Sequence, residues 1–217
     1  MFDYDLLNYL EGYLTENRKQ RFLEVLANRT NFLTVAVEDV FQLHNTSAVL
    51  RSCDAFGIQT LHVIEDRFGQ RLDKNIAMGA EQWVDVNRYA KSKDCIKALK
   101  DTGYEIVATT PHEKSHTVQA FEFKSKTALF FGTEREGLSE EVLQMADRSI
   151  HIPMQGFTES LNISVCAAIA IRDLKEKLVH SNYDWQLSET ELLEKRLDWT
   201  KKSIKDVEGI INRYRSD

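Results

Sequence analysis

Short apolar runs alternate along this chain with longer segments of helical period, and this alternation constrains the fold more than any other feature. The run at 33–37 is rich in β-branched residues and is typical of a buried strand. Strands that alternate with helices form βαβ units, which build parallel sheets covered by helices. We therefore predict an α/β fold with a mainly parallel sheet and helices on both faces. Further strands are expected at 59–64, 104–109, 127–131 and 149–152.

The helical segments divide the chain into three parts. A helix is expected from Asn45 to Phe56, because this segment has helical period and ends at Gly57, a favourable C-cap. Further helices are predicted at 88–101 and 160–180, and both ends of the chain also have helical patterns. The expected organisation is an N-terminal helical extension at 1–30, a central α/β domain at 31–180 and a C-terminal helical extension at 181–217.

The overall charge, taken alone, argues against a nucleic-acid-binding protein. The 217 residues include 28 Lys and Arg against 34 Asp and Glu, which gives a net charge of -6. Phosphate backbones favour basic surfaces, so such a chain would not be selected on charge as a nucleic-acid binder. Binding nevertheless needs only a local basic face, so the total charge does not exclude RNA.

Composition excludes several other classes of protein. With 2 Pro and 9 Gly, the chain is neither collagen-like nor of low complexity. No apolar run reaches the roughly 18 residues of a membrane helix, and the first residues are acidic where a signal peptide is basic. The three cysteines are far apart without a CxxC pair, which predicts reduced thiols in a cytoplasmic protein.

Three stretches carry polar residues where strands pass into helices, and the first covers residues 39–57. Asn45 follows the first strand and is a candidate N-cap. Arg51 and Asp54 are three residues apart and share a helix face. A surface salt bridge is one interpretation of this pair. The apolar neighbours of Arg51 favour the other, in which its side chain points into a cleft at the edge of the helix.

The second stretch, 128–141, is a buried strand followed by a loop between two glycines. Loops at the carboxyl ends of parallel strands are where α/β folds build ligand sites. Gly132 would let a ligand approach the backbone, and Gly137 would permit a left-handed turn. The alternative is ordinary turn chemistry before a helix that begins near Ser139.

The third stretch, 150–168, runs from a strand through a loop into a helix. Ser160 and Asn162 are polar where an ordinary core helix needs neither residue. As structural roles, Ser160 would cap the helix and Asn162 would satisfy a nearby carbonyl group.

In this order and with these separations, the three stretches resemble the three motifs of the SpoU/TrmH branch of the SPOUT superfamily, the RNA ribose 2′-O-methyltransferases. The resemblance covers residues 30–175, and the flanking helices are similar in placement to those of the subgroup that methylates guanosine 18 of tRNA. It implies a deep trefoil knot at about 127–170, with S-adenosylmethionine as the cofactor. It also implies a homodimer whose active site lies at the subunit interface.

The same resemblance assigns roles to individual residues. Arg51 matches the essential arginine that activates the ribose hydroxyl. An arginine stays protonated in proteins, so two roles remain open for it: a base, or a cation that binds phosphate and stabilises the developing alkoxide. Glu134 would orient Arg51 or a neighbouring donor. The matching catalytic positions are Arg51, Asn45, Glu134, Ser160 and Asn162, and the matching cofactor positions are Thr109, Gly132, Ile152 and Leu161.

The RNA contacts are expected on the helical extensions. The N-terminal candidates are Arg18, Lys19, Arg21 and Arg29, and the C-terminal candidates are Lys195, Arg196, Lys201, Lys202 and Lys205, for which a solvated helix face is a strong alternative. No metal is expected. His112, Glu113 and His116 form a cluster, but the adjoining Pro111 favours a loop over a zinc-binding helix, and methyl transfer from a sulfonium needs no metal.

The resemblance leaves three hypotheses about function. The first is methylation of guanosine 18 in the D-loop of tRNA, because helical extensions flank the central domain and 1–30 is too short for a separate RNA-binding domain. The second is the same chemistry on rRNA or another tRNA nucleotide, since Thr46 and the segment 157–159 depart from the family pattern. The third is a non-catalytic RNA-binding or assembly protein, against which the intact polar positions argue.

Overall fold

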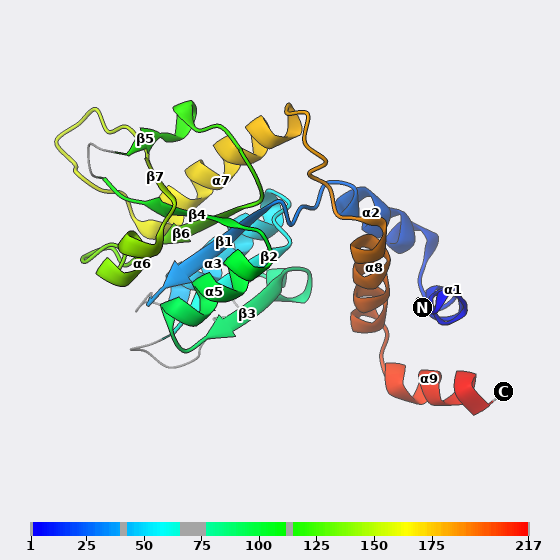
Figure 1. Cartoon of the computed structure of the whole chain (residues 1–217). Coiled ribbons are helices and arrows are strands. Elements are labelled where there is room, and N and C mark those ends of the chain that lie inside the picture. The colour runs from blue at the N-terminus through cyan, green and yellow to red at the C-terminus, as the bar shows by residue number, and fades with distance from the viewer. Residues whose placement is uncertain (1, 40–42, 66–76, 112–114, 217) are drawn as a thin grey trace. The chain divides into compact units, whose positions relative to one another are not determined.

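The computed structural model describes residues 2–39, 43–65, 77–111 and 115–216 (Figure 1). These residues form two compact units. One runs from Thr30 to Trp185, and the other combines the residues up to Arg29 with those from Gln186 onward.

The larger unit is built on a seven-stranded sheet with the strand order β3-β2-β1-β6-β4-β7-β5. Every pairing between neighbouring strands is parallel, which confirms the predicted parallel α/β sheet. In register, Val37 lies between Val63 and Phe131. The strands are β1 Leu33–Glu38, β2 Thr60–Ile64, β3 Asp85–Tyr89, β4 Glu105–Thr109, β5 His116–Thr117, β6 Thr127–Phe131 and β7 Arg148–His151.

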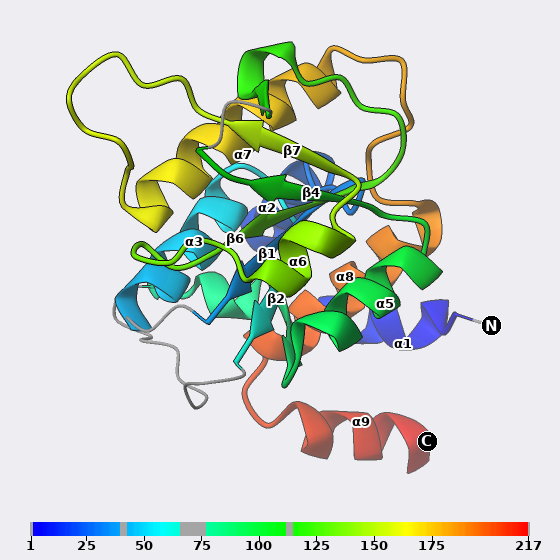
Figure 2. The ribbon, with the colours of Figure 1, turned by 60° about the vertical axis from the view of Figure 1, so that its left-hand side comes forward.

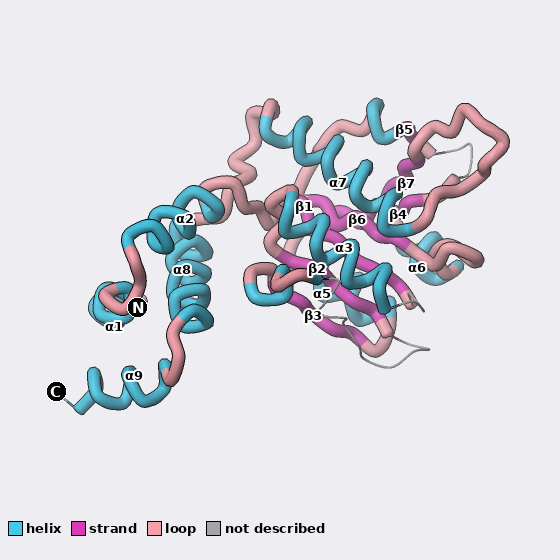
Figure 3. Tube along the Cα trace, turned by 180° about the vertical axis from the view of Figure 1, so that it is seen from behind, coloured by secondary structure: helices cyan, strands magenta, loops and turns pink. Residues whose placement is uncertain are grey.

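Helices cover both faces of this sheet (Figures 2 and 3). Helices α3 (Leu43–Ala55) and α7 (Ile163–Val179) pack on one face, against side chains such as Val35 and Val37. Helices α5 (Ser92–Asp101) and α6 (Glu140–Met145) pack on the other, against alternate residues such as Ala36. Successive strand residues point to opposite faces, and both faces are covered, so the interior strand β1 is buried throughout. Short 3₁₀ turns at Ala80–Gln82 and Val118–Ala120 precede β3 and follow β5.

Two parts of this unit differ from the sequence prediction. The helix expected at 88–101 begins at Ser92, and the residues before it form the edge strand β3. Its sequence, Asp-Val-Asn-Arg-Tyr, is mostly polar because an edge strand is only partly buried, so it lacks the apolar signal of the central strands. The two-residue strand β5 also has no apolar run that would reveal it.

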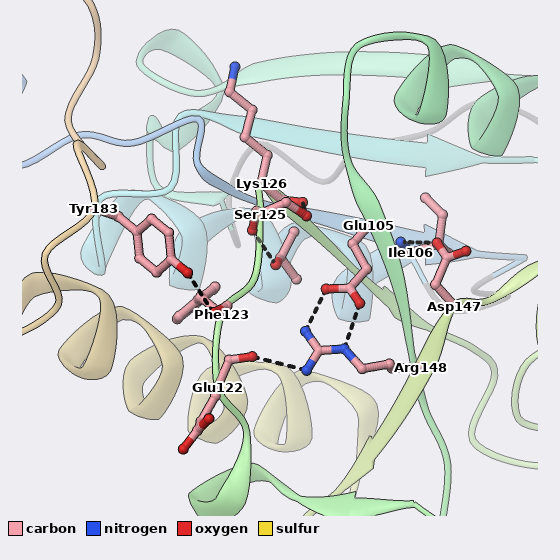
Figure 4. A network of polar contacts seen from close by, with 10 residues as sticks. Glu105, Ile106, Glu122, Phe123, Ser125, Lys126, Asp147, Arg148 and Tyr183 are labelled. Carbon is pink, nitrogen blue, oxygen red and sulfur yellow. Dashed lines mark hydrogen bonds and ion pairs between the residues drawn. The ribbon is translucent and has the colours of Figure 1, made fainter.

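An ion pair between Arg148 and Glu105 fixes the amino-terminal end of the sheet (Figure 4). The guanidinium donates to both oxygens of Glu105 over 2.6 and 2.5 Å, and also to the carbonyl of Glu122 over 2.9 Å. It lies over the ring of Phe121, 4.2 Å from its centre. Beside it, the carboxylate of Asp147 accepts from the Ile106 amide over 2.8 Å. These contacts tie the segment before β6 to β4 and β7.

The smaller unit joins helices from both ends of the chain. Glu11 on α1 and Arg196 on α8 form a bidentate pair with distances of 2.5 and 2.6 Å. Trp199 on α8 is buried against the ring of Phe22 and the guanidinium of Arg29. Ser188 begins α8 with a capping box. The helices are α1 Tyr4–Glu11, α2 Glu16–Leu26, α8 Glu189–Ser203 and α9 Val207–Ser216.

Candidate active site

The three polar stretches meet at the carboxyl ends of neighbouring strands. The first follows β1, the second follows β6 and the third follows β7. In the sheet, β1 pairs with β6, while β4 pairs with both β6 and β7, so all three loops leave the same edge. Ligand sites of parallel α/β sheets lie at this edge.

Three side chains, one from each stretch, form a hydrogen-bonded cluster there. Asn45 Nδ2 donates to Glu134 Oε1 over 2.9 Å. Asn162 Nδ2 donates to the same carboxylate oxygen and, over 3.3 Å, to Asn45 Oδ1. In the sequence, only the family resemblance predicts that these three residues belong to one site. Glu134 Oε1 thus accepts from two side-chain amides, those of Asn45 and Asn162.

Asn162 has a second role as the N-cap of α7. Its Oδ1 accepts from the Ser164 amide over 2.9 Å and from the Ser164 hydroxyl over 2.6 Å. The oxygen therefore caps the helix while the amide nitrogen is left to bind Glu134 and Asn45. The prediction that Ser160 caps this helix is wrong, because the helix starts later and Ser160 lies exposed in the preceding loop.

Asn45 also departs from its predicted capping role. Helix α3 already includes Leu43, so Asn45 lies within the first helical turn. Its side chain is buried, donates to Glu134 and accepts from Asn162. The residues before Leu43, from 40 to 42, lie outside the described part of the chain.

The loop that carries Glu134 is a tight turn closed by backbone bonds. The amide of Thr133 donates to the Gly137 carbonyl over 2.9 Å, and the Gly137 amide donates back over 3.1 Å. Gly137 has a φ of 70°, as expected for the glycine that ends a three-residue hairpin loop. A Cβ on Gly132 would lie 2.1 Å from the backbone of Gly137, so this position accepts only glycine without a shift of the loop.

Arg51 lies on α3 with an exposed side chain. It forms no hydrogen bond or ion pair within the part of the chain that the structure describes, so neither the surface pair with Asp54 nor a bond to Glu134 is present. A solvent-facing guanidinium two turns into α3 is available to bind a phosphate or another anion.

The candidate cofactor positions also converge on the same edge. Thr109 ends β4 and donates its hydroxyl to the Phe130 carbonyl over 2.8 Å. Gly132 follows β6, and Ile152 follows β7. Leu161 precedes the Asn162 cap and is half-buried. The first three thus lie at the carboxyl ends of adjacent strands, Thr109 as the last residue of β4 and the other two just after β6 and β7.

One residue of this edge was missed in the sequence. Glu38 is the last residue of β1, and its buried carboxylate accepts three hydrogen bonds, two of them from Ser139. The signal that would have found it is a charged residue that directly ends an otherwise uncharged strand. Burial of a carboxylate is costly unless it is hydrogen-bonded, so such a residue implies dedicated partners.

The remaining titratable groups near the site do not point to metal or thiol chemistry. Burial raises the pKa of Cys166, on α7, to about 11, so the thiol stays protonated. Among the described residues no three His, Cys, Asp or Glu side chains are grouped as metal ligands would be. His116 is exposed, whereas His112 and Glu113 of the predicted cluster lie outside the described residues. Within the same described residues, no helix has the length and apolar character that crossing a membrane requires.

The predicted RNA contacts of the N-terminal helices fall into two groups. Arg18 and Arg21 are exposed on α2, and Lys19 is half-buried in a pair with Glu16. Arg29 is only 1% exposed and lies over Trp199. The prediction that Arg29 contacts RNA is therefore wrong for the chain in this conformation, because its long side chain is used in packing.

Comparison with known proteins decides the family. The model of the SpoU rRNA Methylase family matches residues 32–172, which include all three stretches. The chain belongs to this family. A relative from Borreliella burgdorferi, named tRNA (guanosine(18)-2'-O)-methyltransferase, is 40% identical over 95% of this chain and 96% of its own length.

Solved structures of SpoU family members have the same fold. The A. aeolicus TrmH/SpoU tRNA modifying enzyme superposes with a TM-score of 0.78 at 30% identity, over 88% of this chain and 98% of that chain. The SpoU methyltransferase AviRb from Streptomyces viridochromogenes, crystallised with its cofactor AdoMet, superposes with a TM-score of 0.62 at 24% identity. That match covers 73% of this chain and 65% of AviRb.

Proposed function

We propose that this SpoU family protein is an S-adenosylmethionine-dependent ribose 2′-O-methyltransferase that acts on guanosine 18 in the D-loop of tRNA. The observation that carries the proposal is the cluster of Asn45, Glu134 and Asn162, which joins the three family motifs at one edge of the sheet. The tRNA substrate rests on the relatives of 30 to 40% identity that carry this name.

The residues at the sheet edge fit the cofactor. Three of the four candidate positions, Thr109, Gly132 and Ile152, lie at the carboxyl ends of adjacent strands, and Gly132 has no side chain to obstruct a ligand. With Leu161, their loops would hold S-adenosylmethionine mainly through backbone groups, in agreement with the lack of a Gly-x-Gly-x-x-Gly sequence. When bound, this cofactor supplies an electrophilic methyl group on a sulfonium.

The chain's own residues would position the ribose and stabilise charge. The exposed guanidinium of Arg51 would bind the adjacent phosphate and stabilise negative charge that develops on the 2′-oxygen. Electrostatic stabilisation suits an arginine, whereas a base would need the guanidinium to lose its proton. Glu134 would keep the amides of Asn45 and Asn162 in place, and Ser160 would contact the RNA from the exposed loop before α7.

We also propose the knot and the dimer that the family implies. The strand β4 lies between β6 and β7, both later in sequence, so the chain returns twice to flank β4, as a knot at about 127–170 requires. Apolar side chains are exposed on the third stretch and on α7, namely Phe157, Met154 and Val165. A second copy of the chain would cover them and complete the site at the subunit interface.

The RNA-binding surface would lie on the smaller unit. Arg18, Lys19 and Arg21 on α2 are the proposed contacts, together with exposed lysines of the C-terminal helices. Arg196 is not among them, because its guanidinium is held in a bidentate pair by Glu11, whose carboxylate is nearly buried. A cytoplasmic location, expected from the cysteines, completes the proposal.

Transfer of a labelled methyl group tests the proposal. The protein is incubated with labelled S-adenosylmethionine and with bulk tRNA or rRNA, and the modified ribose is mapped as a nuclease-resistant dinucleotide. Label at guanosine 18 of tRNA is expected. Label in rRNA or at another tRNA nucleotide would keep the chemistry and change the substrate, and no label in any RNA would refute an enzymatic function.

A further inference from the structure

We propose that Glu38 is a positioning residue, which holds the loop of Glu134 in register with Asn45 and Asn162. The inference deepens the proposed function and rests on it for its effect on activity. The hydrogen bonds by which Glu38 holds the loop do not depend on the proposed function.

Glu38 occupies an unusual place for a carboxylate. It ends β1, an interior strand whose six residues are all buried, and is itself only 4% exposed. Its Oε2 accepts from the Ser139 amide over 2.7 Å, and its Oε1 accepts from the Ser139 hydroxyl over 2.7 Å. The Ser92 hydroxyl also donates to Oε1. A carboxylate with this many donors is stable when buried.

The two bonds from Ser139 fix the far end of the Glu134 loop. Ser139 is the N-cap of α6, and its Oγ also accepts from the Val142 amide over 3.3 Å. Both the donor and the acceptor of the hydroxyl are therefore in use. At the near end, β6 is paired on both sides up to the residues before Gly132. The loop is anchored at both ends, and the anchor at Ser139 is the side chain of Glu38.

Glu38 is also linked by the chain to the partner of Glu134. Strand β1 leads into α3, which carries Asn45 in its first turn. Asn45 follows Glu38 by seven residues, of which 40–42 lie outside the described part of the chain, and the Glu134 loop is held to Glu38 through Ser139. A hydrogen bond of 2.9 Å weakens steeply when one partner moves by about 1 Å, so the hold of Glu38 on Ser139 bears on the geometry of the cluster.

The bond from Ser92 provides a comparison that distinguishes positioning of the loop from a contribution to stability alone. It donates to the same carboxylate oxygen but begins α5, which carries none of the three stretches. If Glu38 served only to stabilise the fold, loss of the Ser92 bond and loss of the Ser139 bonds would have similar consequences. If Glu38 positions the loop, only loss of the Ser139 bonds would change catalysis.

The test compares four variants of the full chain: Glu38→Ala, Glu38→Asp, Glu38→Gln and Ser92→Ala. Gln keeps the length of Glu and removes its charge; its oxygen still accepts from the Ser139 amide, and its nitrogen donates to the Ser139 hydroxyl oxygen, so two hydrogen bonds to Ser139 remain although the one to the hydroxyl changes direction. Asp keeps the charge but withdraws the carboxylate from Ser139. We expect kcat to fall by about 10- to 100-fold in Glu38→Ala and less in Glu38→Asp, since misplacement by 1 Å costs up to about 100-fold. In Glu38→Gln and Ser92→Ala it should stay within about threefold of the native value.

Two further readouts distinguish positioning from loss of structure. The Kd for S-adenosylmethionine and the KM for tRNA should change by less than about threefold in all four variants, because only the chemical step is affected. Amide hydrogen exchange at 133–139 should speed up in Glu38→Ala and Glu38→Asp, and stay slow in Glu38→Gln and Ser92→Ala. This exchange is measured without RNA, so it tests Glu38 even if the native protein methylates none.

Specific outcomes would overturn the inference. It is wrong if Ser92→Ala lowers kcat as much as Glu38→Ala does, or if exchange at 133–139 is unchanged in Glu38→Ala. Should Glu38→Ala fail to fold, the comparison of Asp with Gln decides. Equal activity and equal exchange in these two variants would also overturn it. A native protein that methylates no RNA, with exchange as expected, would refute the proposed function and leave the positioning role of Glu38 standing.

Discussion

Asn45 donates to Glu134 over 2.9 Å, although 89 residues of sequence separate them. The bond crosses from the helix after β1 to the loop after β6, two strands that are neighbours only in the folded sheet. Three of the polar side chains that the family motifs supply are thereby in place in the single chain. Arg51 stands apart from them, exposed on the same helix as Asn45.

Replacing Arg51 by alanine should abolish methyl transfer and leave cofactor binding nearly intact. The exposed guanidinium would act on the RNA, and loss of one such electrostatic group costs about 100- to 1,000-fold in kcat. Single-turnover transfer and calorimetric titration with S-adenosylmethionine measure the two effects. Arg172→Ala, which removes an exposed arginine from α7, is the matched control and should retain transfer. A parallel loss of cofactor binding in Arg51→Ala would show that Arg51 belongs to the cofactor site.

The two roles of Asn162 are separable by substitution. In Asn162→Asp the carboxylate still caps α7, but it cannot donate to Glu134 and repels it. In Asn162→Ala both roles are lost, and loss of a cap costs about 0.5–2 kcal/mol. We therefore expect both variants to lose transfer, with the larger drop in melting temperature in Asn162→Ala. Full transfer by Asn162→Asp would contradict a catalytic role for the cluster.

Gly132→Ala should disrupt the loop after β6. The new Cβ would lie 2.1 Å from the Gly137 carbonyl carbon and oxygen, so the turn must open. Overpacking of this kind costs about 1–3 kcal/mol, and we expect the affinity for S-adenosylmethionine to fall about tenfold or more. Gly156→Ala is the control, because there the nearest atom would be 4.0 Å away. Unchanged cofactor affinity in Gly132→Ala would remove this loop from the proposed cofactor site.

The Arg148–Glu105 pair should contribute to stability and not to catalysis. Both side chains are mostly buried, with exposed fractions of 15% and 13%, at the end of the sheet opposite the site. Arg148→Met leaves the Glu105 carboxylate unpaired, and breaking a pair this buried costs about 2–4 kcal/mol. The melting temperature should drop by roughly 5–15 °C, and kcat should be unchanged at a temperature where the variant is folded. Thermal melts and single-turnover assays on the same samples check both statements. A fall in kcat would show that loss of the ion pair at one end of the sheet alters the site at the other end.

Stability should decrease in mild acid because of His62 on β2. Burial lowers the pKa of this imidazole to about 4 from 6.5, so between these values the unfolded chain binds a proton that the folded chain does not. The free energy of unfolding should therefore fall by about 3 kcal/mol as the pH falls from 6.5 to 4. Urea titrations of the native protein and of His62→Leu between pH 4 and 7 measure this effect. The variant should show a shallower dependence on pH, and equal slopes would exclude His62 as the cause.

The central strands and the three polar stretches were predictable, because buried strands and strand-to-helix loops leave strong local patterns. The edge strand Asp85–Tyr89 was not, since its partial burial leaves no apolar run. That Asn162, and not the predicted Ser160, caps α7 was also not determined by the local sequence. Both are capping residues, and boundaries read from sequence are uncertain by a few residues.

Contacts between distant segments limited the prediction of the site. The partners of Glu38 are 54 and 101 residues away, so its carboxylate gives no local sign of what it binds. Arg29 looked like a surface cation near the first strand, and only the position of Trp199 shows that it is packed inside. In both cases the role of a charged residue is set by a partner that is distant in sequence, and the residues next to it in the chain do not reveal that partner.

The helical unit made from both ends of the chain has a consequence for biosynthesis. Helices α1 and α2 leave the ribosome well before Arg196 and Trp199, which pack against them and follow more than 160 residues later. At ribosomal rates that interval is on the order of 10 to 30 s, during which the apolar stripe of Leu6 and Leu10 has no native cover. The stripe therefore stays exposed on the nascent chain until the residues of α8 and α9 that cover it have been synthesised.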